Sequence, residues 1–225
     1  MTGVRLSSDS QSPAPSKPFG GRSEYTFTPD SRAIVFGARN AGREEAWSTD
    51  FDLYHARATG SGAPRNLTEA NSALDGGPVF SADGKTLYYR AMKRPGFEAD
   101  RLALMAMDLA SGKTREIAPQ WDRSAGGITL SADGQTIYTP AGDMGQHPLF
   151  AVDVASGTAK PVVAEGSISA FDIAGDTLAF TRNTLKTGDQ LFTTTLAGAP
   201  LRAITPSAQD VLKDVSFGDF EQFDF

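Results

Sequence analysis

Residues 80–89 read Phe80-Ser-Ala-Asp-Gly-Lys-Thr-Leu-Tyr-Tyr89, an apolar residue followed by a tight polar turn and an apolar run. Serine, aspartate and glycine each favour a turn, because the two polar side chains bond to nearby backbone and glycine accepts positive φ. The run carries the aromatic residues that strands prefer. The segment therefore predicts a β-hairpin.

The same plan occurs three more times along the chain. The segments are Phe27-Thr-Pro-Asp-Ser-Arg-Ala-Ile-Val-Phe36, Leu130-Ser-Ala-Asp-Gly-Gln-Thr-Ile-Tyr138 and Phe171-Asp-Ile-Ala-Gly-Asp-Thr-Leu-Ala-Phe180. A second hairpin follows each first one, as in Leu104-Met-Ala-Met-Asp-Leu-Ala-Ser-Gly112. Two hairpins per unit give four antiparallel strands, and repeats of about 40–50 residues with four strands are typical of propeller blades.

The repeat predicts an all-β protein, a partial β-propeller of about four four-stranded antiparallel blades. We expect residues 1–17 to be irregular and residues 18–216 to form the blades. Regular turn signals also fit a β-sandwich. A sandwich, however, does not predict the same two hairpins recurring in the same order.

Composition excludes several classes of function. The 225 residues carry a net charge of −6 and no strongly basic window, so the footprint of a nucleic-acid binder is missing. Without cysteine there is no disulfide, thiol catalyst or thiolate metal site. No apolar run is long enough to span a membrane. The Asp-containing turns lack the alternating oxygen ligands of a calcium loop, and we expect no cofactor.

The connections between strands point to one rim as the binding surface. In a four-stranded meander, the connection between strands 2 and 3 and the link to the next blade emerge on the same face. Two of these connections, residues 39–50 and 92–101, are long, and long connections carry function more often than short ones. The link at residues 120–123 opens on that face as well.

The adjacent carboxylates of Glu44 and Glu45 are the sharpest feature of that rim. Two carboxylates on one short turn can converge on an ammonium group and accept charge-assisted hydrogen bonds. Trp47 could add a cation–π face, with Arg43, Trp121 and Arg123 completing the candidate set. The alternative is that both glutamates are solvated loop residues with Arg43 as a casual partner.

The sequence contains no complete catalytic apparatus. It has no Gly-x-Ser-x-Gly nucleophile elbow, no phosphate loop and no His-Glu-x-x-His zinc pair. In the second long connection, the acids Glu98 and Asp100 could form a salt bridge with Arg101. Such a salt bridge would have a structural role.

Five segments are distinctive: Pro18-Phe-Gly-Gly21, Tyr25-Thr-Phe-Thr-Pro-Asp30, Gly42-Arg-Glu-Glu-Ala-Trp-Ser-Thr-Asp-Phe-Asp-Leu-Tyr54, Ala91-Met-Lys-Arg-Pro-Gly-Phe-Glu-Ala-Asp-Arg101 and Trp121-Asp-Arg-Ser124. They resemble the propeller of bacterial dipeptidyl peptidases, in the acylaminoacyl-peptidase-like branch of the prolyl oligopeptidase family. The resemblance covers nearly the whole chain from about Pro18, and its insertions are more specific than its turn repeats.

The resemblance implies a propeller that caps an α/β-hydrolase domain and admits short peptides with a free amino terminus. A Ser-Asp-His triad in that domain cleaves the peptide bond through an acyl-enzyme. In related dipeptidyl peptidases a propeller Glu-Glu pair holds the substrate's amino terminus, and Glu44-Glu45 matches that pair in type. The resemblance also suggests a periplasmic or secreted location, and residues 217–225 as a linker toward the hydrolase domain.

We therefore expect a non-catalytic propeller part of a serine peptidase that gates access and anchors the substrate amino terminus. The alternative is a non-enzymatic TolB-like propeller scaffold that binds a protein partner. Family propellers have seven or eight blades, whereas four are predicted for this chain. The flanks of an open half are unprotected, so we expect self-association through open blade edges.

Overall fold

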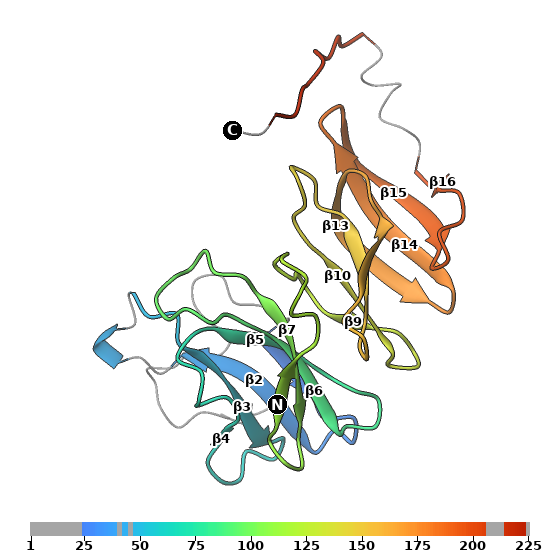
Figure 1. The fold of residues 1–225 in the computed structure, drawn as a ribbon. Coiled ribbons are helices and arrows are strands. Elements are labelled where there is room, and N and C mark those ends of the chain that lie inside the picture. The colour runs from blue at the N-terminus through green and yellow to red at the C-terminus, as the bar shows by residue number, and fades with distance from the viewer. Residues whose placement is uncertain (1–23, 40–41, 45–46, 206–213, 224–225) are drawn as a thin grey trace. The chain divides into compact units, whose positions relative to one another are not determined.

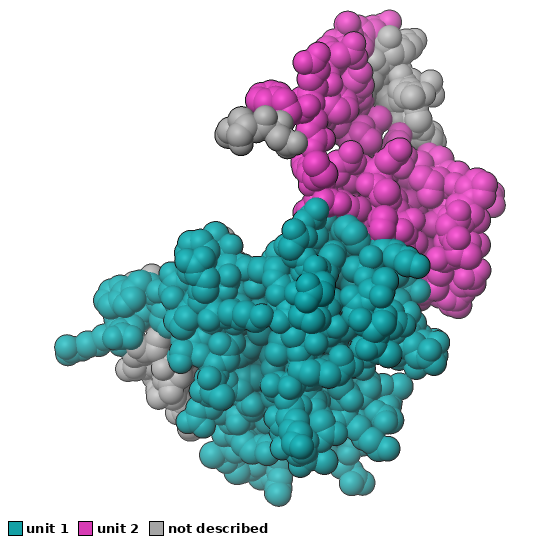
Figure 2. All heavy atoms as spheres, viewed as in Figure 1, with its two compact units in different colours: residues 1–141, 150–160 teal, residues 142–149, 161–225 magenta. Residues whose placement is uncertain are grey.

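The structure, a computed structural model, describes residues 24–39, 42–44, 47–205 and 214–223. The predicted irregular segment 1–17 lies outside these residues. The chain divides into two compact units, residues 1–141 with 150–160 and residues 142–149 with 161–225 (Figure 2).

The strands form four four-stranded sheets, here called blades 1 to 4 in chain order, as the repeat predicts (Figure 1). Blade 1 contains β1 (Tyr25–Phe27), β2 (Ala33–Arg39), β3 (Phe51–Arg57) and β4 (Arg65–Asn66). Blade 2 contains β5 (Asp75–Phe80), β6 (Thr86–Ala91), β7 (Ala103–Asp108) and β8 (Thr114–Glu116).

Blade 3 contains β9 (Thr129–Leu130), β10 (Thr136–Pro140), β11 (Leu149–Asp153) and β12 (Ala159–Val163). Blade 4 contains β13 (Ser167–Ala174), β14 (Thr177–Thr184), β15 (Thr187–Thr195) and β16 (Arg202–Ala203). In every blade the strand order follows the chain, which is the meander expected of a propeller.

The first hairpins of blades 1, 2 and 3 close through the side chain of a turn aspartate. Asp83 Oδ1 accepts hydrogen bonds from Ser81 Oγ at 2.7 Å and from the Lys85 amide at 3.1 Å. The hydrogen bond from Ser81, with that from the Lys85 amide, holds the pKa of Asp83 below its usual value. Asp133 makes the same pair of contacts with Ser131 and Gln135, so these aspartates are turn residues.

The second hairpins of blades 2 and 3 close with a near-identical turn. Asp108 Oδ1 accepts from the amide and hydroxyl of Ser111, at 2.7 and 2.6 Å. Asp153 Oδ1 accepts from the amide and hydroxyl of Ser156, at 2.6 and 2.7 Å. Both turns end on a glycine with positive φ, Gly112 at 70° and Gly157 at 72°. A left-handed conformation favours glycine at these two positions.

The core of the first unit explains the unbroken run Leu87-Tyr-Tyr89 in β6. Leu87 and Tyr89 pack with Val35 and Leu53 of blade 1. Tyr88, whose side chain leaves the opposite face of the strand, packs in a second cluster with Ile137 and Val152 of blade 3. Blade 2 is therefore packed against blade 1 on one face and blade 3 on the other. Because both faces of this run are buried, its residues are apolar without alternation.

Blade 4 is held by aromatic pairing across its strands. Phe180 of β14 lies opposite Phe192 of β15, and their rings stack with centroids 5.8 Å apart. Residues 214–223 contain no strand, and Asp219 Oδ1 lies 2.9 Å from Lys186 Nζ. The predicted role of residues 217–225 as a linker stays a prediction.

Candidate functional site

The two long connections of the first unit meet at one rim. Insertion 1 (residues 40–50) joins β2 to β3, and insertion 2 (residues 92–102) joins β6 to β7. The Gly96 amide donates to the hydroxyl of buried Thr49 at 2.8 Å, which ties the two insertions together. The rim that topology predicts is therefore built from neighbouring segments of blades 1 and 2.

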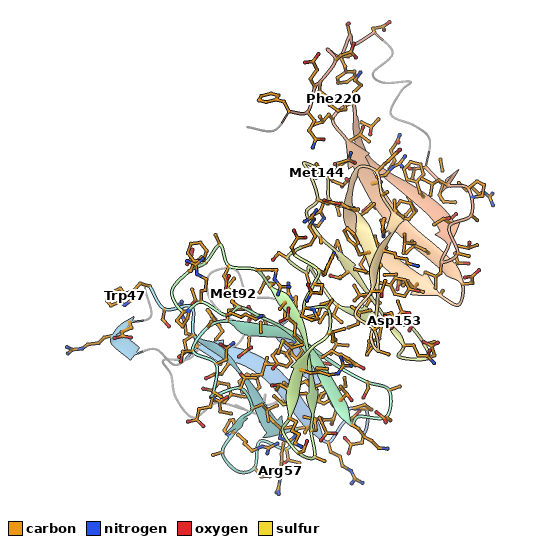
Figure 3. The ribbon with its side chains drawn as sticks, in the orientation of Figure 1. Trp47, Arg57, Met92, Met144, Asp153 and Phe220 are labelled. Atoms are coloured by element: carbon orange, nitrogen blue, oxygen red, sulfur yellow. The ribbon has the colours of Figure 1, made fainter. Side chains whose placement is uncertain are left out.

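Insertion 1 presents one end, with Arg43, Glu44 and Trp47, to solvent. Arg43 and Glu44 are exposed in the short 3-10 helix η2 (Gly42–Glu44). Trp47 is 67% exposed, and Figure 3 shows its side chain beside η2 and apart from the strands. The carbonyl of Glu44 accepts hydrogen bonds from the amides of Trp47 and Ser48, at 3.1 and 2.9 Å. Glu45 lies outside the described residues.

The base of insertion 1 is held by Arg39, the last residue of β2. Its Nη1 donates to the Ser48 carbonyl at 2.9 Å, and its guanidinium carbon lies 4.8 Å from the centre of the Phe51 ring. A cation over an aromatic face adds a favourable electrostatic contact. The exposed residues of insertion 1 are therefore carried on an anchored base.

Insertion 2 is folded back on itself by Asp100. Its Oδ2 accepts from the amides of Lys93 and Arg94, both at 2.8 Å. The hydrogen bond from the Lys93 amide is the largest of the effects that lower the pKa of Asp100. The Arg94 guanidinium lies 3.9 Å from the centre of the Phe97 ring. This closed turn positions the Gly96 amide that bonds to Thr49.

Glu116 of β8 links insertion 2 to the segment that enters blade 3. Its Oε2 accepts from Lys93 Nζ at 2.7 Å and its Oε1 from Arg101, while its side chain is only 13% exposed. Burial alone would raise the pKa of Glu116, but the hydrogen bonds and charges of Arg101 and Lys93 hold it below its usual value. Arg101 thus pairs with Glu116, a partner outside insertion 2 that sequence reasoning missed.

The second pair of predicted residues lies on the link between blades 2 and 3. The carbonyl of Trp121 accepts from Arg101 Nη1 at 3.0 Å, and its ring meets Phe150 edge-on with centroids 5.2 Å apart. Trp121 is thus packed against the core of the first unit, while Arg123 pairs with Asp122. The structure therefore joins Trp121 to insertion 2, whereas Arg43, Glu44 and Trp47 lie on the exposed end of insertion 1.

A cluster of three aspartates, Asp50, Asp52 and Asp75, was not predicted from the sequence. Asp52 Oδ2 accepts from Asn66 Nδ2 at 2.6 Å, and burial followed by the charge of Asp52 raises the pKa of Asp50. Asp75, the first residue of β5, is 1% exposed, and burial raises its pKa to about 7. In the sequence, Asp75 stands before Gly-Gly-Pro, and an aspartate in that position is also typical of an ordinary turn.

The described part of the chain holds no group of three His, Cys, Asp or Glu side chains placed to bind a metal ion. Among the same residues, no helix is long and apolar enough to cross a membrane.

No family model matches the sequence. It is 27% identical over 88% of its length to dipeptidyl-peptidase 5 of Porphyromonas gingivalis, and 30% identical over 81% to dipeptidyl-peptidase 5 of Trichophyton equinum. The chain spans 29% and 26% of these two relatives.

Solved structures agree on the fold. The acylaminoacyl peptidase of Pyrococcus horikoshii matches 85% of the chain, and the chain covers 28% of that protein, with a TM-score of 0.62 and 16% identity. The β-propeller domain of the trilobed protease of Pyrococcus furiosus matches 84%, with 57% of that domain covered, a TM-score of 0.60 and 17% identity. TolB of Acinetobacter baumannii also matches 84%, with 45% covered, a TM-score of 0.59 and 17% identity.

Proposed function

The chain belongs, as a propeller portion, to the prolyl oligopeptidase family of peptidases, and on this premise we propose that it is the non-catalytic propeller part of a serine peptidase. The sequence has no nucleophile elbow, so the chemistry belongs to an α/β-hydrolase domain of the same protein. The blades gate access to that domain and admit short peptides with a free amino terminus. The names of the relatives support this proposal.

The anchoring role falls to insertion 1. Glu44 and Glu45 accept hydrogen bonds from the substrate ammonium group, and Trp47 offers an aromatic face, with Arg43, Trp121 and Arg123 completing the surface. The single observation that carries this assignment is the bond between Thr49 and Gly96, because it holds the base of insertion 1 against insertion 2. An exposed acidic turn on an anchored base suits a ligand that arrives from solvent.

The test is kinetic and uses the longer protein that carries this chain. Glu44→Ala and Glu45→Ala each remove one charge-assisted hydrogen bond, so kcat/KM for release of a dipeptide should fall about tenfold to a hundredfold. Hydrolysis of a small ester without an ammonium group should change far less. Glu98→Ala, an exposed carboxylate on insertion 2, serves as the matched control. Unchanged dipeptide kinetics in both glutamate variants would remove the anchoring role.

The second candidate is a non-enzymatic TolB-like scaffold that binds a protein partner, and the structural likeness to TolB favours it. A scaffold has no need of a paired-acid insertion, whereas amine anchoring requires one. Hydrolase sequence in the same polypeptide would separate the two candidates.

We also propose that the isolated chain self-associates through open blade edges. Support comes from exposed apolar residues at edge strands, Phe27 of β1 and Leu201 and Ile204 beside β16. Sedimentation should show a mass that rises with concentration between about 1 and 100 μM, the range in which weak protein contacts form. A constant monomer mass over that range would rule out this association.

A further inference from the structure

A cavity of about 330 Å³ lies against blade 2 in the first unit. Its lining comes from the link between β4 and β5, from β5, β6 and β7, from insertion 2, and from the turn and strand that follow β7. It includes Leu67, Asn71, Asp75, Tyr89, Met105 and Met107. One water occupies about 30 Å³ of liquid, so the cavity has room for a small organic molecule.

Asp75 brings a buried carboxyl group to this cavity. The side chain is 1% exposed, and its Oδ1 accepts from Asn71 Nδ2 at 3.1 Å. Its Oδ2 is buried and accepts no hydrogen bond of normal geometry among the described residues, although the Thr68 hydroxyl also acts on this carboxyl group and lowers its pKa. A buried acceptor without a partner loses its hydration and gains nothing in return, and native proteins rarely leave one unpaired. A ligand that donates a hydrogen bond would remove that cost.

The charges around the cavity favour a cationic donor over a neutral one. The carboxylates of Asp50 and Asp52 act on Asp75 and add negative potential. Lys93 lines the cavity, but its Nζ is paired with Glu116 at 2.7 Å, so its charge is already compensated. Burial, with the charge of Asp75, raises the pKa of Tyr89, so this phenol stays neutral.

The remaining walls suit an alkyl chain. Met105 and Met107 of β7 and Leu67 of the link present flexible apolar side chains, and methionine adapts its shape to a bound group. A carboxylate at one point of an otherwise apolar hollow recognises a molecule with one cationic end and an apolar body.

We propose that this cavity binds a primary alkylammonium group, with the ammonium donating to Asp75 Oδ2 and the alkyl chain lying along Met105, Met107 and Leu67. The site is distinct from insertion 1 and does not depend on the proposed peptidase function. Its ligand is a free alkylamine or the side chain of a lysine.

Calorimetric titration of the full chain at pH 8, above the pKa of Asp75, with n-butylammonium beside neutral 1-butanol tests the proposal. The wild-type chain should bind butylammonium at least tenfold more tightly than butanol. Asp75→Asn keeps the shape of the site but removes its charge, and should weaken butylammonium binding at least tenfold while butanol changes little. Asp133→Asn, in an exposed turn of blade 3 that does not line the cavity, should leave both affinities unchanged. Equal binding of the two probes, or an unaffected Asp75→Asn variant, would overturn the proposal.

Two further arms guard against misfolding and identify the source of the ligand. Ala70 is exposed and lines the cavity, so Ala70→Trp should block both probes while the melting temperature stays near that of the wild type. Unimpaired butylammonium binding in this variant would place the amine elsewhere and contradict the proposal.

Nα-acetyl-lysine amide should bind with the same Asp75 dependence if the ligand is a lysine side chain, whereas butylammonium alone should bind if it is a free amine.

Discussion

Replacing Gly157 by alanine should lower the free energy of unfolding by about 4 kcal/mol, whereas the same change at Gly112 should cost about 1 kcal/mol. The two glycines end near-identical turns, with φ of 72° and 70°. The cost of placing a side chain in the left-handed region is therefore common to both variants.

The surroundings of the two glycines differ. A Cβ atom on Gly157 would lie 2.2 Å from the Ile117 carbonyl oxygen and 3.1 Å from Ala118 Cα, which are backbone atoms that cannot rotate away. A Cβ on Gly112 would meet nothing within 4 Å. Gly157 is thus the point where the last turn of blade 3 touches the link from blade 2, and alanine there must displace one of them.

Urea unfolding of both variants beside the wild type measures this difference. We expect the urea concentration at the midpoint of unfolding to be well below that of Gly112→Ala for the Gly157→Ala variant. The dependence of the unfolding free energy on urea concentration should change little in Gly112→Ala. Equal losses in the two variants would mean that the approach of this turn to Ile117 is not a packing constraint of the fold.

The second large effect is the pH dependence that Asp75 imposes on stability. Its pKa is about 7 in the folded chain against an unfolded value of 3.8, so the folded state holds the proton more tightly. The stability it contributes is complete below the unfolded pKa and is lost as the pH rises through the folded pKa. Between pH 5 and pH 8 this loss should amount to about 3 kcal/mol.

Asp75→Asn carries no titrating group at this position and should lack that loss. The difference in unfolding free energy, variant minus wild type, should therefore rise by about 3 kcal/mol between pH 5 and pH 8, because only the wild type loses stability over this range. Asp83→Asn is the control, because the exposed Asp83 has a lowered pKa and is ionised across this range in both states. A difference between Asp75→Asn and wild type that stays constant with pH would show that Asp75 is not held in the buried environment described above.

Local turn chemistry made the blades predictable. Asp83 and Asp133 bind the serine two residues earlier and the amide two residues later, so four or five residues are sufficient to specify each hairpin. The apolar run of β6 likewise follows from burial on both faces. Hairpins identified this way recur in order, which is why the four sheets could be expected from the sequence.

The candidate site was less predictable because its contacts join distant residues. Glu116 holds Arg101 and Lys93, and Thr49 accepts from Gly96, 47 residues away along the chain. Neither pairing leaves a periodic signal. The burial of Asp75 likewise depends on the link packing over blade 2, which no local pattern encodes. The anchoring pair of Glu44 and Glu45 stays a prediction, since Glu45 lies outside the described residues.

The nucleotide sequence on either side of the codons for these 225 residues is the most direct test of the claim that these blades serve a hydrolase in the same polypeptide. If they do, we expect the reading frame to continue beyond Phe225 into a Gly-x-Ser-x-Gly elbow followed by an aspartate and a histidine. A reading frame that holds further blades and no hydrolase would contradict the peptidase proposal and favour the TolB-like scaffold.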